Sequence, residues 1–457
     1  MSDGLSTNLR WDQREGNRTC VIGAGMSGIA VAAELRARGV PVTVYDRRDA
    51  IGGLWHHPDP ATPGPAYRSL HLNTARGLTC FPDMPMPATL PRYPRHDQVA
   101  GYLRDYAARR GVTELVRLGT EVINVNRSAE GTWQVTTRPA EGDGTQHTQT
   151  FDHLVVAAGH HWSPKVPALP GDETFPGRKL HSFDYSDPVQ HAGRRVVVVG
   201  FGNSAADIAV DLSRIAARTV MAQRRGVHVV PKTLMGIPID EIAGMRWWSR
   251  LAFADQRRLV ELLLRVIRGR LADHGVAEPD HPLFGGAITV SDELLSRISH
   301  GDITVKPAIS HIDGSEIHFS DGTVELADDL LYCTGYHVEF PFLPAEWVFD
   351  QHGRVALYHR VVSLPHPNLY FAGLIRPFGA VAHLVHAQAA WISDLVEGVA
   401  NLPSQEKMRA EVNERLTASS ARYGSASYAS IQVDYAQYLE TVRRQRRSSA
   451  TLSTHLD

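Results

Sequence analysis

Apolar and polar positions along the chain form two copies of one pattern. The run TCVIGAG at 19–25 is apolar and ends in a glycine turn, helical periodicity follows as far as Gly39, and VTVYD at 42–46 is apolar again. This order predicts a strand, a turn, a helix and a second, parallel strand. Residues 194–225, which read RRVVVVGFGNSAADIAVDLSRIAARTVMAQRR, repeat it. The pattern therefore predicts an α/β protein with two doubly wound, Rossmann-like dinucleotide-binding domains.

The rest of the pattern adds further strands, a long loop and one amphipathic helix. The runs DHLVVAAG at 152–159 and DLLYCTG at 329–335 are apolar and end in glycine. Between 309 and 326, two Asp-Gly pairs divide an alternating run, which predicts a small antiparallel β-meander. Residues 56–95 are rich in proline and are predicted to be mostly loop. Charges interrupt the apolar segment 251–271, which predicts an amphipathic helix rather than a membrane span.

Composition limits the class of protein. The 457 residues carry a formal net charge of −2, so no overall field attracts nucleic acid. The three cysteines form no CxxC pair, which counts against a disulfide framework and a dithiol redox centre. None of the 23 histidines has HExxH spacing, so no metal site is expected. Residues 1–18 are polar, without the apolar core of a signal peptide. These features predict a cytoplasmic protein with no membrane anchor and no nucleic-acid partner.

The first glycine turn, GAGMSG at 23–28, has the spacing of a pyrophosphate-binding turn. Gly23 permits the tight turn, Gly25 lets the backbone approach the phosphates, and Gly28 lets the helix pack closely on the strand. Asp46 falls 18 residues after Gly28, at the end of the next predicted strand. A carboxylate at this place can accept hydrogen bonds from both ribose hydroxyls.

The second turn, GFGNSA at 200–205, lacks that acid. The same count from Ala205 reaches Gln223, and Arg224 and Arg225 follow it. A carboxylate suits a free 2′-hydroxyl, whereas a guanidinium pairs with a 2′-phosphate. The second site is therefore predicted to take NADP rather than NAD, with Arg224 the better candidate because it directly follows the replaced acid.

Two nucleotide-binding units admit three classes of protein: a flavoprotein monooxygenase, a two-dinucleotide disulfide reductase, and an NADP-sensing or scaffold protein. The missing CxxC pair counts against the reductase. The sensor would need no flavin, yet the acid-marked first turn indicates one. So does IGGLW at 51–55, because its two glycines allow a second close approach of backbone to the cofactor.

The segment between the two turns carries a resemblance to a known family. Phe175, Gly177, His181 and Tyr185 match FxGxxxHxxx(Y/F), the fingerprint of flavin-containing monooxygenases. Baeyer–Villiger relatives usually end this motif in Trp followed by Pro or Asp, so Tyr185 favours the first group. Further blocks resemble the family in family order over most of the chain: IGGLW, SLHLNTA (69–75), SDELLSRISHGDITVKP (291–307), CTGYHVEFPFL (333–343) and PNLYFAGLIRPFGAVAHLVHAQAAW (367–391). HVVPK at 228–232 is similar to plant YUCCA-type members.

The resemblance implies an NADPH-dependent FAD monooxygenase. NADPH would reduce FAD, the reduced flavin would capture O₂ as a C4a-hydroperoxide, and one oxygen atom would pass to a soft nucleophile. That substrate would be the amine nitrogen or the sulfur of a small metabolite, an indole-like one among them. Baeyer–Villiger oxidation or oxidative decarboxylation of a carbonyl compound is the alternative. The substrate's identity and a homodimeric state stay open.

The resemblance also implies roles for particular residues. Asn73 aligns with the family asparagine beside the flavin ring and is expected to be catalytic, because an amide donates and accepts hydrogen bonds without titrating. His181 is expected to be a structural residue of the linker rather than an acid–base catalyst. The residues expected at the two cofactors are Gly23, Ala24, Gly25, Met26, Ser27, Gly28, Asp46, Gly53, Leu54, Trp55, Leu72, Asn73, Thr74, Val122, Gly200, Gly202, Asn203, Ser204, Arg224, Arg225 and Gln388.

The expected FAD-binding domain is discontinuous and comprises residues 19–172 and 325–440. The NADP-binding domain, 173–324, is inserted between them and carries the β-meander. A polar extension (1–18) and a flexible polar tail (441–457) would flank the domains. The amphipathic segment near 241–285, with Trp247 and Trp248, would cover the substrate entrance, belong to the core or form a dimer contact.

Overall fold

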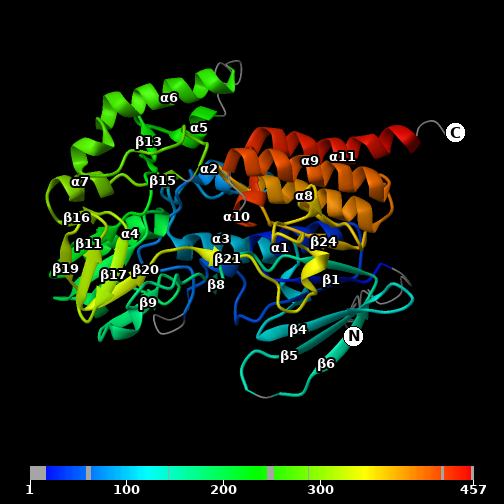
Figure 1. Ribbon diagram of the computed structural model, residues 1–457. Coiled ribbons are helices and arrows are strands. Elements are labelled where there is room, and N and C mark those ends of the chain that lie inside the picture. The colour runs from blue at the N-terminus through cyan, green and yellow to red at the C-terminus, as the bar shows by residue number, and fades with distance from the viewer. Residues whose placement is uncertain are drawn as a thin grey trace, which may run out of the picture.

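The computed structural model describes residues 17–57, 63–142, 144–243, 252–286, 288–423 and 427–453. Trp247 and Trp248, to which a role was assigned from the sequence, lie outside the described residues. Two sheets lie side by side, the first mixed and the second wholly parallel, each with helices packed against it (Figure 1). The chain thus contains the two doubly wound α/β units that its pattern predicted.

The first sheet has seven strands in the order β22-β23-β24-β7-β1-β2-β3. β1 (Thr19–Ile22) pairs in parallel with β2 (Val42–Tyr45) and β7 (His153–Val156). Strands from the C-terminal part of the chain extend this sheet beyond β7. The remaining members are β3 (Val116–Arg117), β22 (Leu357–Tyr358), β23 (Val362–Ser363) and β24 (Leu369–Phe371).

Alternate side chains of the first sheet face two different layers. Val21, Val44 and Val155 pack with a helical layer, whereas Ile22 and Val156 face the other side. The helices are α1 (Met26–Ala37), α3 (His96–Arg109), α8 (Ala382–Val396), α9 (Gln405–Tyr423) and α11 (Tyr435–Ser453). The other side is covered by an antiparallel sheet of β4 (Thr120–Arg127), β5 (Trp133–Pro139) and β6 (His147–Phe151). This antiparallel sheet was not predicted from the sequence.

The second of the two large sheets is wholly parallel, with the strand order β16-β11-β10-β20-β9. Like the first sheet, it is covered by a different layer on each face. Val196 and Val198 face α4, whereas Val197 faces the β-meander. The strands are β9 (Arg178–His181), β10 (Arg195–Val199), β11 (Arg218–Ala222), β16 (Ile303–Lys306) and β20 (Asp329–Tyr332), and the helices are α4 (Asn203–Leu212) and α7 (Leu294–Ser299). The meander of β17 (Ile309–Asp313), β18 (Glu316–Phe319) and β19 (Val324–Leu326) is confirmed.

Other predicted elements are also present. The part of the molecule built on the second large sheet is called the second half below, and the part built on the seven-stranded sheet the first half. The amphipathic helix is α6 (Phe253–Arg268), which lies at the edge of the second half next to α5 (Ile239–Ala243) (Figure 1). Within the described part of 56–95, only the short helix α2 (Arg76–Thr79) interrupts the expected loop before α3 begins. No helix of the described residues combines the length and the apolar character that crossing a bilayer requires.

Two expected boundaries are wrong. The return to the first domain was placed at residue 325, but β20 pairs in parallel with β10, so the chain stays in the second half through Tyr332. The tail from 441 was expected to be flexible, but α11 continues to Ser453 and packs against α8. Tyr438 and Val442, one helical turn apart, are buried there and anchor α11. Residues 454–457 lie outside the described part.

The linker motif, which runs from Phe175 to Tyr185, lies along β20. β9 pairs in parallel with β20, and a Cβ on Gly177 would come 2.7 Å from the ring of Phe175. His181 donates from Nε2 to the carbonyl of Gly335 at 3.0 Å, while its Nδ1 accepts from the backbone of Phe183. With both nitrogens committed to the backbone, and burial lowering its pKa, His181 is a neutral structural residue here.

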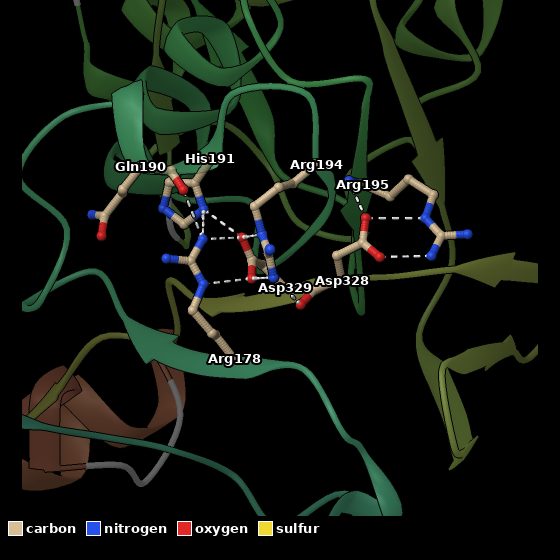
Figure 2. Close-up of polar contacts among 7 residues, drawn as sticks. All are labelled: Arg178, Gln190, His191, Arg194, Arg195, Asp328 and Asp329. Atoms are coloured by element: carbon tan, nitrogen blue, oxygen red, sulfur yellow. Dashed lines mark hydrogen bonds and ion pairs between the residues drawn. The ribbon is translucent and has the colours of Figure 1, made fainter.

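A buried carboxylate fixes the start of the same strands. Asp329 is fully buried and accepts two hydrogen bonds from each of Arg178 and Arg194, at 2.6–2.8 Å (Figure 2). Nδ1 of His191 lies 2.7 Å from Oδ2 of the same carboxylate. Burial alone would raise the pKa of Asp329, but the hydrogen bonds from these three residues hold it well below its usual range. The cluster ties β9, β10 and β20 together at one end of the sheet.

Candidate functional site

A cavity of about 500 Å³ opens at the carboxyl ends of β1, β2, β7 and β24. In a doubly wound sheet, ligands bind at this edge. Twelve of the residues expected at the cofactors line it: Gly23, Gly25, Met26, Ser27, Asp46, Gly53, Leu54, Trp55, Leu72, Asn73, Thr74 and Val122. Ala24 and Gly28 are buried behind the wall. Segments separated by up to a hundred residues in sequence therefore form one surface.

The first glycine turn and the IGGLW segment (51–55) meet in the wall of the cavity. A Cβ on Gly53 would lie 2.8 Å from Cα of Gly25, and Gly53 has a φ of +55°. Gly23 has a φ of +109°, and a Cβ there would lie 2.5 Å from the carbonyl oxygen of Ala157. Both positions leave no room for a side chain, so main-chain atoms line this part of the cavity, as the close approach of a pyrophosphate would require.

Asp46 joins the end of β2 to the first glycine turn. Its Oδ2 accepts from the amide of Ala24 at 2.6 Å, and its Oδ1 accepts from the amide of Arg48 at 2.8 Å. Burial raises the pKa of Asp46, although these backbone hydrogen bonds oppose the rise. Each carboxylate oxygen still has a lone pair available, because a carboxylate offers about four acceptor sites. Asp46 can therefore hold the turn and accept from a ribose at once.

Asn73 lines the cavity and is half-buried. Its Oδ1 is buried and has no hydrogen-bond partner among the described residues. The neighbouring residues are well held: the amide of Leu72 donates to the carbonyl of Pro94 at 2.9 Å, and the hydroxyls of Thr74 and Thr79 are 2.6 Å apart.

Part of the wall is rich in histidine and was not predicted from the sequence. His160, His161 and Trp162 follow β7 and line the cavity together with Arg376. Burial, and the charge of Arg376, lower the pKa of His161 to about 4 and that of His160 well below its usual value. His161 pairs through Nε2 with the hydroxyl of Tyr428 at 2.6 Å. Their position directly after a parallel strand that ends in glycine was the signal available in the sequence.

Gln388 was expected near the flavin but does not line the cavity. It is fully buried in α8, where its Oε1 accepts from the amide of Gly373 at 2.9 Å and its Nε2 donates to the hydroxyl of Tyr438 at 2.7 Å. Gly373 does line the cavity. Gln388 therefore supports the wall from behind.

The second glycine turn repeats the geometry of the first. Gly200 has a φ of +129°, and a Cβ there would lie 2.5 Å from the carbonyl oxygen of Cys333 on the neighbouring strand. Gly202 caps α4, and Asn203 in its first turn accepts from the amide of Val290 at 2.8 Å. Ser204 is half-buried beside it. None of these turn residues is among those that line the 500 Å³ cavity, so the two turns form separate surfaces.

At the end of β11, Gln223 stands where the first domain has its acid, and two arginines follow it. Gln223 is buried, and its Oε1 accepts from the amide of Ala277 at 3.0 Å. Arg224 and Arg225 are exposed at the end of β11, and neither forms an ion pair with another described residue. Two unpaired guanidinium groups at this edge leave a positive surface open to an anionic ligand.

The fold and the two glycine turns define a class: an α/β protein with paired Rossmann-like units and no cluster of three metal-ligating side chains among its described residues. Residues 16–452 match the family model described as flavin-binding monooxygenase-like. The chain is 33% identical over 441 residues to flavin-containing monooxygenase 5 of Rattus norvegicus, covering 93% of this chain and 82% of the relative. It is also 33% identical to dimethylaniline monooxygenase [N-oxide-forming] 2 of Mus musculus over 439 residues, covering 93% and 81%.

Solved structures share the fold. S-allyl-L-cysteine S-oxygenase from Allium sativum superposes with a TM-score of 0.71 at 24% identity, over 94% of this chain and 88% of that one. Cyclohexanone monooxygenase with bound ε-caprolactone superposes with a TM-score of 0.70 at 19% identity, over 96% and 98%.

The chain belongs to the flavin-binding monooxygenase-like family. It is a monooxygenase, and its cofactors are FAD and NADPH, as the resemblance implied. The disulfide-reductase and sensor alternatives are thereby set aside.

Proposed function

We propose that the enzyme transfers one oxygen atom of O₂ to a soft nucleophile, the nitrogen or sulfur of a small metabolite. The observation that carries the proposal is the position of the half-buried Asn73 amide in the wall of the cavity that the first glycine turn also lines. An amide at this position offers a fixed, neutral hydrogen-bonding group to a reacting centre at any physiological pH.

FAD would occupy the 500 Å³ cavity, where it supplies the redox chemistry that activates O₂. The chain's own residues would bind and orient it. Gly23, Gly25 and Gly53 would admit the pyrophosphate, and Asp46 would accept from the ribose hydroxyls. The apolar side chains of Leu54, Trp55, Phe342 and Ile375 belong to the same wall and would keep water from the reacting atoms.

NADPH would bind at the second glycine turn. The amides at the start of α4 would face its pyrophosphate, with Asn203 and Ser204 close by. Arg224, and in second place Arg225, would pair with the 2′-phosphate. The proposed FAD-binding half comprises residues 19–172 together with the chain after Tyr332, and the NADP-binding half lies between them.

Two observations favour nitrogen or sulfur over a carbonyl substrate. The linker motif ends in Tyr185, and the names of a relative and of a solved structure, N-oxide-forming and S-oxygenase, describe oxygenation of nitrogen and sulfur in those proteins. The fold itself does not decide the reaction, because cyclohexanone monooxygenase shares it. Oxygen insertion next to a carbonyl, or oxidative decarboxylation, is therefore the second candidate.

The test is product analysis by mass spectrometry. Purified holoenzyme, NADPH and O₂ are incubated with a panel of tertiary amines, thioethers, an indole derivative, cyclic ketones and 2-oxo acids. We expect a mass increase of one oxygen atom on the amines or thioethers. Lactones from the ketones, or loss of CO₂ from the oxo acids, without N- or S-oxides would support the second candidate. H₂O₂ as the sole product with every compound would contradict both.

A further inference from the structure

The loop that carries Asn73 is held from the other half of the molecule. The ammonium of Lys232 donates to the carbonyl of Leu72 at 3.3 Å, and Oδ2 of Asp240 accepts from the amide of Ala75 at 2.8 Å. These two contacts flank Asn73, one residue before it and two residues after it. Both partners follow the second glycine turn in the chain, whereas the loop precedes β3 in the first half.

Lys232 is itself placed by several groups. Its amide donates to Oδ1 of Asp292 at 2.8 Å, and its ammonium lies 5.3 Å from the ring centroid of Tyr93. The hydroxyl of Tyr93 donates to the carbonyl of Lys232 at 3.0 Å. A lysine side chain normally moves among many rotamers, so holding it at both ends lowers the entropy cost of its contact with Leu72.

Asp240 stands in α5, directly after the hairpin of β13 (Thr233–Leu234) and β14 (Ile237–Pro238). The amide of Ile239 donates to the carbonyl of Lys232 at 3.1 Å, which closes the hairpin and sets the distance between the two groups that reach the loop. Oδ1 of Asp240 is buried without a partner among the described residues, so the carboxylate's one described hydrogen bond is the bond to Ala75.

We propose that Lys232 and Asp240 are positioning residues, which hold Asn73 at the cavity wall and so couple the NADP half of the molecule to oxygen transfer. The inference rests on the proposed function. The Asn73 loop belongs to a proline-rich segment with little secondary structure, and the first-half contacts that hold it, from Leu72 to Pro94 and between Thr74 and Thr79, do not constrain it toward the second half. The contacts of Lys232 and Asp240 on either side of Asn73 supply that constraint. They come from the half of the molecule that contains the second glycine turn.

Four variants test the inference: Lys232→Met and Asp240→Ala remove the two contacts, Asp240→Asn keeps an acceptor for Ala75, and Arg92→Met is the matched control. Arg92 also reaches across the halves, donating to the carbonyl of Gly236 at 3.0 Å, but it does not flank Asn73. Three quantities are measured on holoenzyme: FAD content, the rate of flavin reduction by NADPH, and the ratio of oxygenated product to NADPH consumed.

We expect Asp240→Ala and Lys232→Met to retain FAD and to be reduced by NADPH at close to the wild-type rate. The ratio of H₂O₂ to oxygenated product should rise roughly tenfold, as the loss of one hydrogen bond to a charged group permits. Asp240→Asn should recover most of the coupling, and Arg92→Met should couple like the wild type. Wild-type coupling in both Asp240→Ala and Lys232→Met would overturn the inference, as would equal uncoupling in Arg92→Met.

Hydrogen–deuterium exchange separates this inference from the proposed function. Amides in peptides that span residues 72–76 should exchange roughly tenfold faster in Asp240→Ala, because the Ala75 amide loses its acceptor. If the wild-type enzyme oxygenates no compound yet these amides exchange faster, the proposed function fails and the positioning role stands. Unchanged exchange with wild-type coupling would remove the positioning role and leave the proposed function intact.

Discussion

The hydroxyl of Tyr67 donates a hydrogen bond of 2.8 Å to Oδ2 of Asp207, joining the loop before Asn73 to helix α4. Burial is the main cause that raises the pKa of Asp207 to about 6. The charge of Lys232 opposes the rise, and the carboxylate of Asp211 adds to it. Ionised Asp207 therefore destabilises the native state. It lies where the two halves of the molecule meet.

Asp207→Asn should stabilise the enzyme above pH 6 and not near pH 4. The native pKa of Asp207 lies above that of an unfolded aspartate, so the wild-type protein loses stability as pH rises between the two values. Asparagine carries no charge and can still accept from Tyr67, so it escapes this loss, which we place at roughly 3 kcal/mol. The measurement is Tm of the holoenzyme at pH 4.5 and pH 7.5. An equal difference between variant and wild type at both pH values would contradict the explanation.

Gly53→Ala should weaken FAD binding by at least roughly tenfold, because the new Cβ would press on Gly25 and the backbone has a positive φ. The control is Gly77→Ala, since a Cβ on Gly77 meets no atom within 4 Å. FAD affinity is measured by flavin fluorescence after removal and re-addition of the cofactor. Wild-type affinity in Gly53→Ala would show that FAD does not approach this turn.

Arg224→Ala should lower kcat/KM for NADPH roughly tenfold to a hundredfold and leave NADH use nearly unchanged, because it removes a charge-assisted contact to the 2′-phosphate. Arg225→Ala should have the smaller effect. Steady-state kinetics with both coenzymes provide the comparison. Equal losses with NADPH and NADH would reject the assignment of Arg224.

Asn73→Ala should still bind FAD and still be reduced by NADPH, but it should release more H₂O₂ and less oxygenated product. The reacting centre would lose a fixed hydrogen-bonding group and gain room for water. Asn126→Ala is the matched control, because Asn126 is exposed on β4 outside the cavity. Product and H₂O₂ are quantified per NADPH consumed. If Asn73→Ala stays coupled, the amide is only a loop residue.

Asp329→Asn should destabilise the protein far more than Asp328→Asn. Both carboxylates bind arginine, but Asp329 is fully buried between Arg178 and Arg194, whereas Asp328 and Arg195 are partly exposed (Figure 2). Asparagine offers Arg178 and Arg194 one acceptor oxygen and no charge, and both guanidinium groups are themselves more than a third exposed, so the loss should be about 2–3 kcal/mol, against about 1 kcal/mol at the exposed pair. Thermal unfolding of the two variants provides the measurement. Similar losses would mean that the cluster does not secure the linker.

The sequence by itself determined the features that depend on local spacing. Each glycine turn needs small residues at set offsets after an apolar strand, so Gly23, Gly25, Gly200 and Gly202 were predictable, as was the acid at Asp46. The β-meander was predictable because an Asp-Gly pair selects a tight turn whatever surrounds it. The missing acid at Gln223 followed from counting residues alone.

Tertiary structure alone decided how distant segments meet. The approach of Gly25 to Gly53, the contacts of Lys232 and Asp240 on either side of Asn73, and the histidine pair at the cavity depend on packing between elements, which no local pattern encodes. The same holds for α11, whose sequence is mostly polar. Its Tyr438 and Val442 are buried, and α11 packs against α8. Local spacing sets which turns and strands can form, whereas the side chains that share a wall are set by how the sheets and helices pack.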